Sequence, residues 1–162
     1  MEEVAGPERT SSLNTHRGWP QAAKHGLRKS GQGGLGITKP HVIGKDALTE
    51  TPVTTSGITR HVAFQGKDFR VSRSLVVPGI VSGWHHHGAY DQYGYMVSGA
   101  ARLEYGPAGH DAITVGPGDF WHMPANTIHR DVNPSATEGQ VAIIFYRGTG
   151  PIVVNVEGPE PG

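Results

Sequence analysis

Short runs of β-branched and aromatic residues, each followed by turn residues, fill the sequence from residue 58 to residue 156. Ten such runs can be marked, at 58–64, 69–77, 84–87, 92–98, 101–105, 112–115, 120–123, 128–132, 140–147 and 152–156. The segments between them, such as Gly116-Pro117-Gly118-Asp119, consist of residues that suit tight turns. Because no helical period of useful length interrupts this pattern, we predict an all-β domain, a barrel or a sandwich.

The domain is expected to begin near residue 41. Residues 1–40 are polar and glycine-rich, without hydrophobic periodicity, and such a segment cannot offset its own ordering entropy. We therefore predict a disordered N-terminal arm over 1–40, or an upstream extension read from a misassigned start codon, followed by one folded domain over 41–158. A chain of 162 residues has room for one such core.

Charge and cysteine content exclude several classes of function. Fourteen basic and fourteen acidic residues give a formal net charge of zero, which argues against nucleic acid as a partner. The chain has no cysteine, so it forms no disulfide and any metal ligand must be histidine or oxygen. No stretch is long and apolar enough for a membrane span or a signal peptide, and we expect a soluble cytoplasmic protein.

Histidines in the run 84–87 point to a metal site. Side chains alternate in an extended strand, so His85 and His87 share one face while His86 points away, and two imidazoles on one face can share an ion. The segment after them can reverse the chain and bring Gln92 back near that face. His129 opens a later strand, after a turn in which Asn126 tolerates the left-handed conformation.

The spacing of these residues resembles the two motifs of the cupin superfamily. The first motif is reproduced by Gly79, five residues, His85-His86-His87, four residues, Gln92, six residues and Gly99, with Gln in place of the family's Glu. The second is matched by Gly118, five residues, Pro124-Ala125-Asn126, two residues, His129, three residues and Asn133, with Asn in place of Gly. The resemblance covers about residues 60–156. It implies a small jelly-roll β-barrel, a metal inside it bound by His85, His87 and His129, and frequently a homodimer.

Glutamine at position 92 changes the chemistry that the resemblance implies. A glutamine amide is neutral, a poor ligand and no base near neutral pH. Gln92 is either a weak fourth ligand with a direct part in the reaction or a hydrogen-bond partner of a ligand imidazole. Three neutral imidazoles would leave positions on the ion for a small anionic chelating substrate and for dioxygen.

Three functions stay open at this point. The first is an iron-dependent dioxygenase of a small anionic substrate, which the resemblance to three-histidine cupins implies. The second is a metal-dependent isomerase, lyase or hydrolase. The third is a non-catalytic cupin that binds a small ligand. The cofactor is expected to be one divalent ion, with Fe(II) favoured and Zn, Mn or Ni as alternatives. For the second function, the bases on offer are His122, Tyr95 or a metal-bound hydroxide. Arg73 is a candidate partner for a substrate carboxylate.

Overall fold

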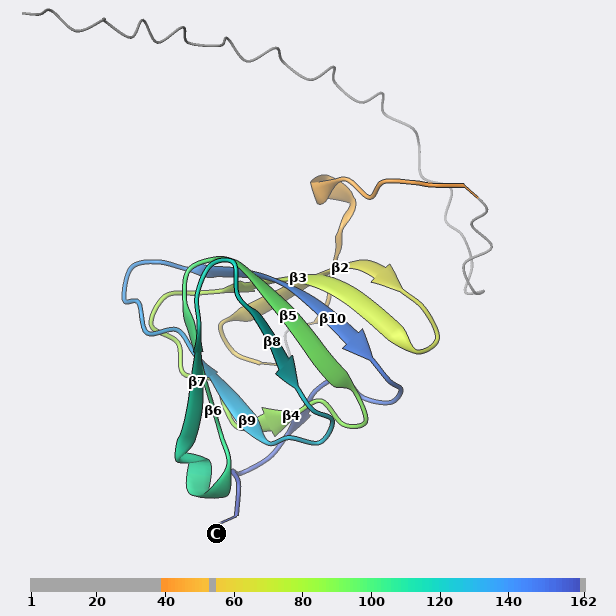
Figure 1. Ribbon diagram of the computed structural model, residues 1–162. Coiled ribbons are helices and arrows are strands. Elements are labelled where there is room, and N and C mark those ends of the chain that lie inside the picture. Colours follow the sequence, from red (N-terminus) through yellow and green to blue (C-terminus); the bar gives the residue numbers. More distant parts are fainter. Residues whose placement is uncertain (1–38, 53–54, 161–162) are drawn as a thin grey trace, which may run out of the picture. The chain divides into compact units, whose positions relative to one another are not determined.

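The computed structural model describes residues 39–52 and 55–160, which form two antiparallel β-sheets packed face to face (Figure 1). The predicted arm over 1–40 lies almost entirely outside the described residues. One sheet has six strands in the order β1-β2-β3-β10-β5-β8, and the other has five in the order β11-β4-β9-β6-β7. The elements are η1 (Lys45–Ala47), β1 (Thr49–Glu50), β2 (Ile58–Gln65), β3 (Phe69–Val76), β4 (His85–His86), β5 (Asp91–Ser98), β6 (Ala101–Tyr105), η2 (Pro107–Gly109), β7 (Asp111–Val115), β8 (Phe120–Met123), β9 (His129–Val132), β10 (Gln140–Arg147) and β11 (Val154–Asn155).

The prediction of an all-β jelly roll is confirmed, and each of the ten predicted runs contains a strand. The only regular elements outside these runs are β1 and two short 3₁₀-helices, among the residues that the structure describes. Strand β1 has two exposed residues, so no apolar alternation marks it in the sequence. The described part of the chain has no helix that is long and apolar enough to cross a membrane.

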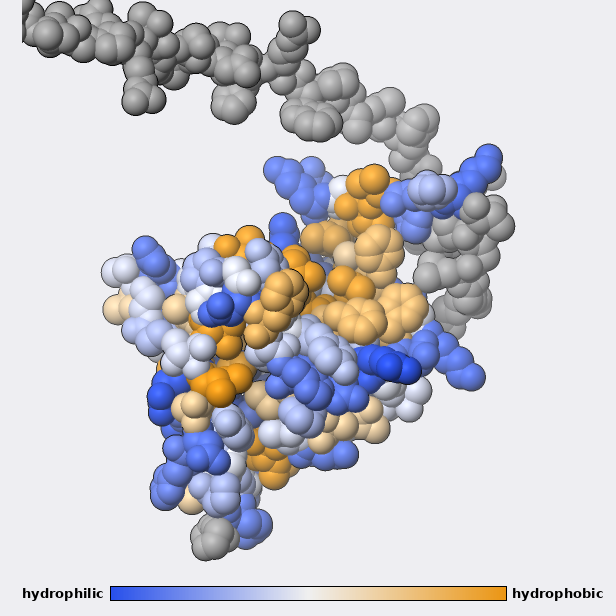
Figure 2. Space-filling view, viewed as in Figure 1, coloured by the Kyte–Doolittle hydropathy of each residue, from blue (hydrophilic) through white to orange (hydrophobic). Residues whose placement is uncertain are grey.

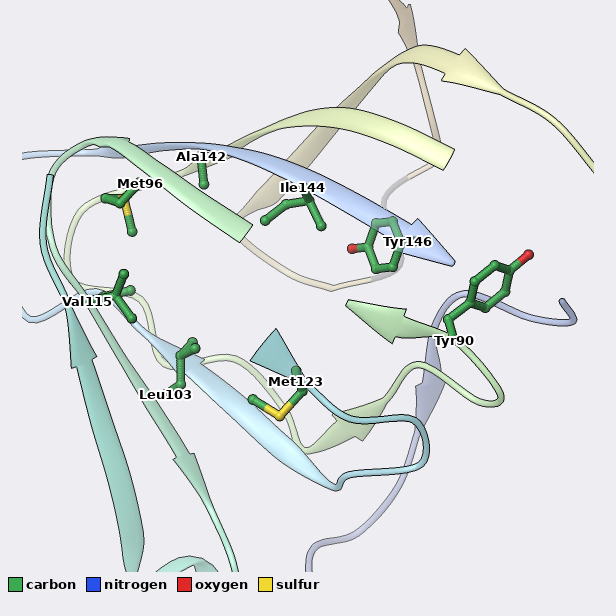
Figure 3. Close-up of a cluster of buried hydrophobic side chains, with 9 residues drawn as sticks. Tyr90, Met96, Leu103, Val115, Met123, Ala142, Ile144 and Tyr146 are labelled. Carbon is green, nitrogen blue, oxygen red and sulfur yellow. The ribbon is translucent and has the colours of Figure 1, made fainter. Parts of the chain in front are cut away.

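The core lies between the sheets and takes side chains from both. Met96 and Ile144 come from the six-stranded sheet, and Leu103 and Val115 point toward them from the other sheet (Figure 3). Each of these side chains is at least 96% buried, which stabilises the fold by about 1.5–3 kcal/mol per residue. A glycine is needed at position 94, because a Cβ atom there would lie 2.1 Å from the ring of Trp121.

The two sheets differ in the polarity of their faces. The inner face of β3 carries buried Ser72 and Ser74, whereas exposed apolar side chains lie on the outer face of the same sheet. These are Tyr93, Tyr95, Val97, Phe120, Ile143 and Phe145. The outer face of the five-stranded sheet instead carries a charged group, in which Glu104 pairs with Arg102 and Arg130.

An antiparallel sheet that packs on one side usually exposes polar residues on the other. The six-stranded sheet departs from this pattern, because buried polar side chains lie beside the apolar core residues on its inner face and aromatic side chains are exposed on its outer face. Figure 2 shows more hydrophobic surface, in orange, where β2, β3 and β10 lie than around the hairpin of β6 and β7. On the inner face Ser74 lines a cavity, and on the outer face the apolar side chains are exposed.

Candidate metal centre

Three histidines meet between the sheets. His85 lies in β4, His87 follows it directly, and His129 is the first residue of β9, where it is paired with His85. Their ring centroids are 4.5–5.3 Å apart and each has one ring nitrogen within 4.8 Å of the other two. All three are at least 98% buried. The structure therefore brings together the three residues that the two sequence motifs single out.

Backbone carbonyls fix the orientation of each ring. The Nδ1 atom of His85 is 3.0 Å from the carbonyl oxygen of Gly83, that of His87 is 2.6 Å from Ile152, and that of His129 is 2.8 Å from Thr127. A carbonyl only accepts hydrogen bonds, so Nδ1 carries the proton in each case. In the neutral ring, Nε2 is then left with a lone pair, which is the form that binds a metal ion.

Burial disfavours the protonated form of His87 and His129. It lowers the pKa of His87 to about 3, with a further contribution from the neighbouring His129. Burial also lowers the pKa of His129. The Nε2 atoms of His85 and His87 are buried and have no hydrogen-bond partner among the described residues. Buried nitrogen atoms with free lone pairs are costly unless a ligand satisfies them, so this donor set fits a divalent metal ion.

The metal-free protein is expected to lose stability as the pH falls from about 6.5 toward about 3. The pKa of His87 is about 3 in the folded chain against 6.5 for a free side chain, so the unfolded state binds more protons in this interval. The free energy of unfolding should fall by up to about 1.4 kcal/mol per pH unit from this residue. Urea titrations across the interval measure this, and a His87→Asn variant should show a shallower slope. An equal slope in both proteins would contradict the assignment.

The turn before His129 adopts the left-handed conformation that the sequence predicts. Asn126 has a φ of 60°, a value that asparagine tolerates better than most residues other than glycine. Asn133, the last residue of the second motif, has a structural part. It is buried, and its side-chain amide donates to the carbonyls of Val77 and Glu138. These contacts fix the chain at the C-terminal end of β9.

Several residues near the motifs face away from the three histidines. The ring of His86 accepts a hydrogen bond from the backbone of Gly88, as expected from its place on the opposite face of the strand. His122 is 45% exposed, lies 2.9 Å from a carboxylate oxygen of Asp91 and stacks on Tyr93. Tyr95 is on the same outer face as Tyr93, so neither His122 nor Tyr95 can serve as the base considered for the second function.

Arg73 also lies on the outer face. Its strand neighbours Ser72 and Ser74 are buried on the inner side, and its partner on β10 is the exposed Ile143. The interpretation of Arg73 as a partner for a substrate carboxylate is therefore wrong. The arginine on the inner face is Arg60 of β2, which is 8% exposed and lines a cavity together with Gln92. Sequence reasoning missed it, although Arg60 alternates with the apolar Ile58 and Val62 on one face of β2.

A carboxylate lies beside the histidines although the glutamate of the family motif is replaced. The Oδ2 atom of Asp131 is 3.5 Å from the Nε2 atom of His85. Burial raises the pKa of Asp131, but the positive charges that His85, His129 and Arg60 can carry outweigh it and hold this pKa below its usual range. Asp131 follows His129 by two residues, so alternation alone places both on one strand face. That spacing is the signal that could have found it.

The polar residues beside the centre line an inner cavity of about 30 Å³. Gln92 is 7% exposed in its wall, and no residue of the described part of the chain hydrogen-bonds its amide. Tyr146 lies in the same wall, with its ring 5.2 Å from that of His87. Its hydroxyl points between the sheets, is buried and has no partner among the described residues (Figure 3). Gln92 and Tyr146 are thus available to a bound ligand.

Comparison with known proteins agrees with this arrangement. A family model described as "Cupin domain" matches residues 72–145, which include both histidine motifs. This segment of the chain is a cupin domain. No curated protein matches this cupin. The family assignment thus rests on the matched domain and on the fold, as the sequence motifs predicted.

Solved structures with the same fold are distant in sequence. KdgF from Halomonas sp. has 24% identity, covers 65% of this chain and 93% of its own, and gives a TM-score of 0.53. A protein with a double-stranded β-helix domain from Klebsiella pneumoniae has 17% identity over 74% of this chain and 99% of its own, with a TM-score of 0.58. Oxalate decarboxylase from Bacillus subtilis has 21% identity and a TM-score of 0.55 over 65% of this chain, but over only 29% of its own. At these identities the likeness shows the fold alone.

Proposed function

We propose that this cupin is an enzyme that binds one divalent metal ion through His85, His87 and His129 and acts on a small anionic substrate. The observation that carries the proposal is the set of three buried imidazoles whose Nδ1 atoms donate to carbonyls, so that the Nε2 atoms are free to bind. Rings oriented in this way lose little entropy when they bind an ion, because the backbone has already fixed them.

The first candidate reaction is the oxidation of the substrate by dioxygen with iron as the metal. A bound divalent ion would polarise an oxygen of the substrate and, if it is a redox metal such as iron, would supply electrons to dioxygen. Gln92 and Tyr146 would orient the substrate by hydrogen bonds from the cavity wall. The three neutral ligands support this candidate, because they do not neutralise the positive charge of the ion, which then attracts an anionic substrate.

The second candidate is a proton-transfer reaction, as in an isomerase, a lyase or a hydrolase. It is favoured by the position of Asp131, whose Oδ2 atom lies 3.5 Å from His85 Nε2 and could accept a proton from a substrate held there. The relation to oxalate decarboxylase, a structure of which is described as having Mn(II) centres, makes manganese a metal to include in the test.

Two assays on the same preparations separate these candidates. Protein loaded in turn with iron, manganese and zinc is incubated with a panel of small organic acids, while oxygen consumption and deuterium uptake from D₂O are measured. Oxygen consumption with iron alone supports the dioxygenase, whereas anaerobic deuterium exchange with a redox-silent ion supports proton transfer. Absence of both, with metal and acid bound, would leave the non-catalytic binding function.

We also propose that the protein forms the homodimer that its family resemblance implies, through the outer face of the six-stranded sheet. Phe120 is 80% exposed there, next to Tyr95, with Ile143 and Phe145 on the adjoining strand β10. Exposed apolar patches of more than a few hundred Å² usually mark an interface. The charged outer face of the other sheet has no comparable patch among the described residues.

Replacing Phe120 by Glu is expected to weaken this dimer at least about tenfold, because the variant would bury an unpaired charge among aromatic side chains. Sedimentation equilibrium measures the dissociation constant. Thr114→Glu is the matched control, since Thr114 is exposed on β7 of the other sheet. A wild type that is monomeric at about 100 μM, or an equal effect of both substitutions, would contradict the proposal.

A further inference from the structure

Arg60 is a buried cation whose guanidinium makes no hydrogen bond or ion pair among the described residues 39–52 and 55–160. Its residue surface is 8% exposed. Only its backbone carbonyl is used, as an acceptor for Thr51. An arginine cannot escape the cost of burial by losing its proton. A buried charge of this kind is costly unless an anion accompanies it. Asp131 in the same inner cavity interacts electrostatically with Arg60, but no ion pair joins the two side chains, so the guanidinium keeps its hydrogen-bonding positions for a bound anion.

Two cavities share this arginine. The inner cavity, of about 30 Å³, is lined by Arg60, Gln92, Asp131 and Tyr146, and has room for about two water molecules. The outer cavity is larger, about 420 Å³, and is lined by Arg60 together with Arg70 of the neighbouring strand. The Nε atom of Arg70 is also buried without a partner among the described residues. The outer cavity thus has two cationic side chains in its wall and no acidic one.

Both cavities border the three-histidine centre. Ile152 lines the outer cavity, and its carbonyl accepts the hydrogen bond from His87 Nδ1. Asp131 lines the inner cavity and is the carboxylate beside His85. A ligand that enters the inner cavity through the outer cavity would therefore have one end near Arg60 and the other end near the Nε2 atom of His85.

We propose that Arg60 binds a carboxylate group of the substrate, which identifies the substrate as a small organic acid. This inference rests on the proposed function, because it concerns the same site. The guanidinium fork matches a planar carboxylate with two parallel hydrogen bonds. The hydroxyl of Tyr146 and the amide of Gln92, which have no partner among the described residues, supply further donors in the same wall. The end of the acid remote from Arg60 lies toward the histidines.

A phosphate dianion fits this site less well than a carboxylate. Asp131 lines the same inner cavity, and its carboxylate would repel a doubly charged group more strongly than a singly charged one. The small inner volume also favours a flat three-atom group over a tetrahedral one. The specificity expected of the site is therefore for monoanionic carboxylates with a short chain.

Calorimetric titration with acetate, glycolate and inorganic phosphate tests this inference. Each probe is added to zinc-loaded and to metal-free protein, and glycolamide serves as the neutral counterpart of glycolate. We expect glycolate to bind at least about tenfold more weakly to an Arg60→Met variant than to the wild type, and Arg60→Lys to recover part of the loss. Arg102→Met, an arginine substitution on the outer face of the other sheet, should leave the affinity unchanged.

Metal content, measured on every preparation, separates the two proposals. Binding of glycolate that depends on Arg60 in protein that takes up no metal would support the carboxylate site and contradict the metal function. Metal binding together with equal glycolate affinity in wild type and Arg60→Met would overturn the carboxylate site alone. Equal affinities for glycolate and glycolamide, tighter binding of phosphate, or no binding of either acid to the wild type would overturn it as well.

Discussion

Alanine at position 85, 87 or 129 is expected to weaken metal binding at least about 100-fold in each case, more than the loss of a residue that only orients a ligand. Each substitution removes one of the three inward Nε2 atoms, and among the described residues no other histidine joins the group. His86→Ala should bind metal as the wild type does, because its ring lies on the opposite face and accepts a hydrogen bond from Gly88. Competition with a chelating dye measures the affinities.

The folded state of each variant has to be checked beside its affinity, because His85, His87 and His129 are buried. Circular dichroism and a melting curve of the metal-free proteins serve this purpose, and His87→Asn offers a second variant that leaves a smaller cavity. Folded variants that bind metal as tightly as the wild type would contradict the assignment of the three ligands. An equal loss in His86→Ala would contradict the argument from strand faces.

Replacing Asp131 by Asn should lower the rate of a proton-transfer reaction by about 100-fold or more, because an amide of the same shape accepts no proton. The Oδ2 atom of Asp131 lies 3.5 Å from His85 Nε2. Among the described residues, no other acidic side chain forms an ion pair with His85. The measurement is the rate of deuterium exchange at the substrate, with metal content as the check that the centre is intact. Gln92→Glu is the matched change in the same cavity wall, since it adds a carboxylate instead of removing one.

Opposite outcomes of the Asp131→Asn variant separate the two candidate reactions. Oxygen consumption with iron that is unchanged by Asp131→Asn would show that the reaction needs no base at this position. Oxygen consumption that is also reduced by Gln92→Glu would show that the reaction uses coordination positions of the ion that the protein leaves open. If exchange is as fast in the variant as in the wild type, Asp131 is no base and the second candidate loses its support. Loss of metal in Asp131→Asn would instead identify Asp131 as a further ligand.

The alternation of side chains along the strands predicts much of this site, and the residues that it did not predict lie on single strands. The spacing of His85 and His87 predicts a shared face, and the residues before His129 predict a turn that Asn126 forms with a φ of 60°. The same rule applied to His129 and Asp131 would have indicated the carboxylate. The strand runs were recognisable for a similar reason, because one face of nearly every strand is packed against the other sheet.

Arg60 was missed although alternation places it with Ile58 and Val62 on one face of β2. Alternation tells which residues share a face but not which face is inside, and burial of apolar residues normally decides the choice. The neighbouring strand β3 gives a conflicting signal, because its inner face has Ser72 and Ser74 while exposed apolar side chains such as Ile143 lie on the outer face of the sheet. The proposed ligand cavity and the proposed dimer face would both account for this conflict.

X-ray absorption spectroscopy of protein loaded with one equivalent of zinc tests the central claim most directly. The structure predicts one tightly bound ion per chain with three imidazole nitrogens at about 2.0–2.1 Å. The scattering pattern of imidazole rings distinguishes these ligands from water and carboxylate oxygens, and the untagged protein excludes histidines of a tag. A spectrum with three imidazoles supports the metal centre formed by His85, His87 and His129; a spectrum with one imidazole or none, or protein that retains no zinc, would contradict it.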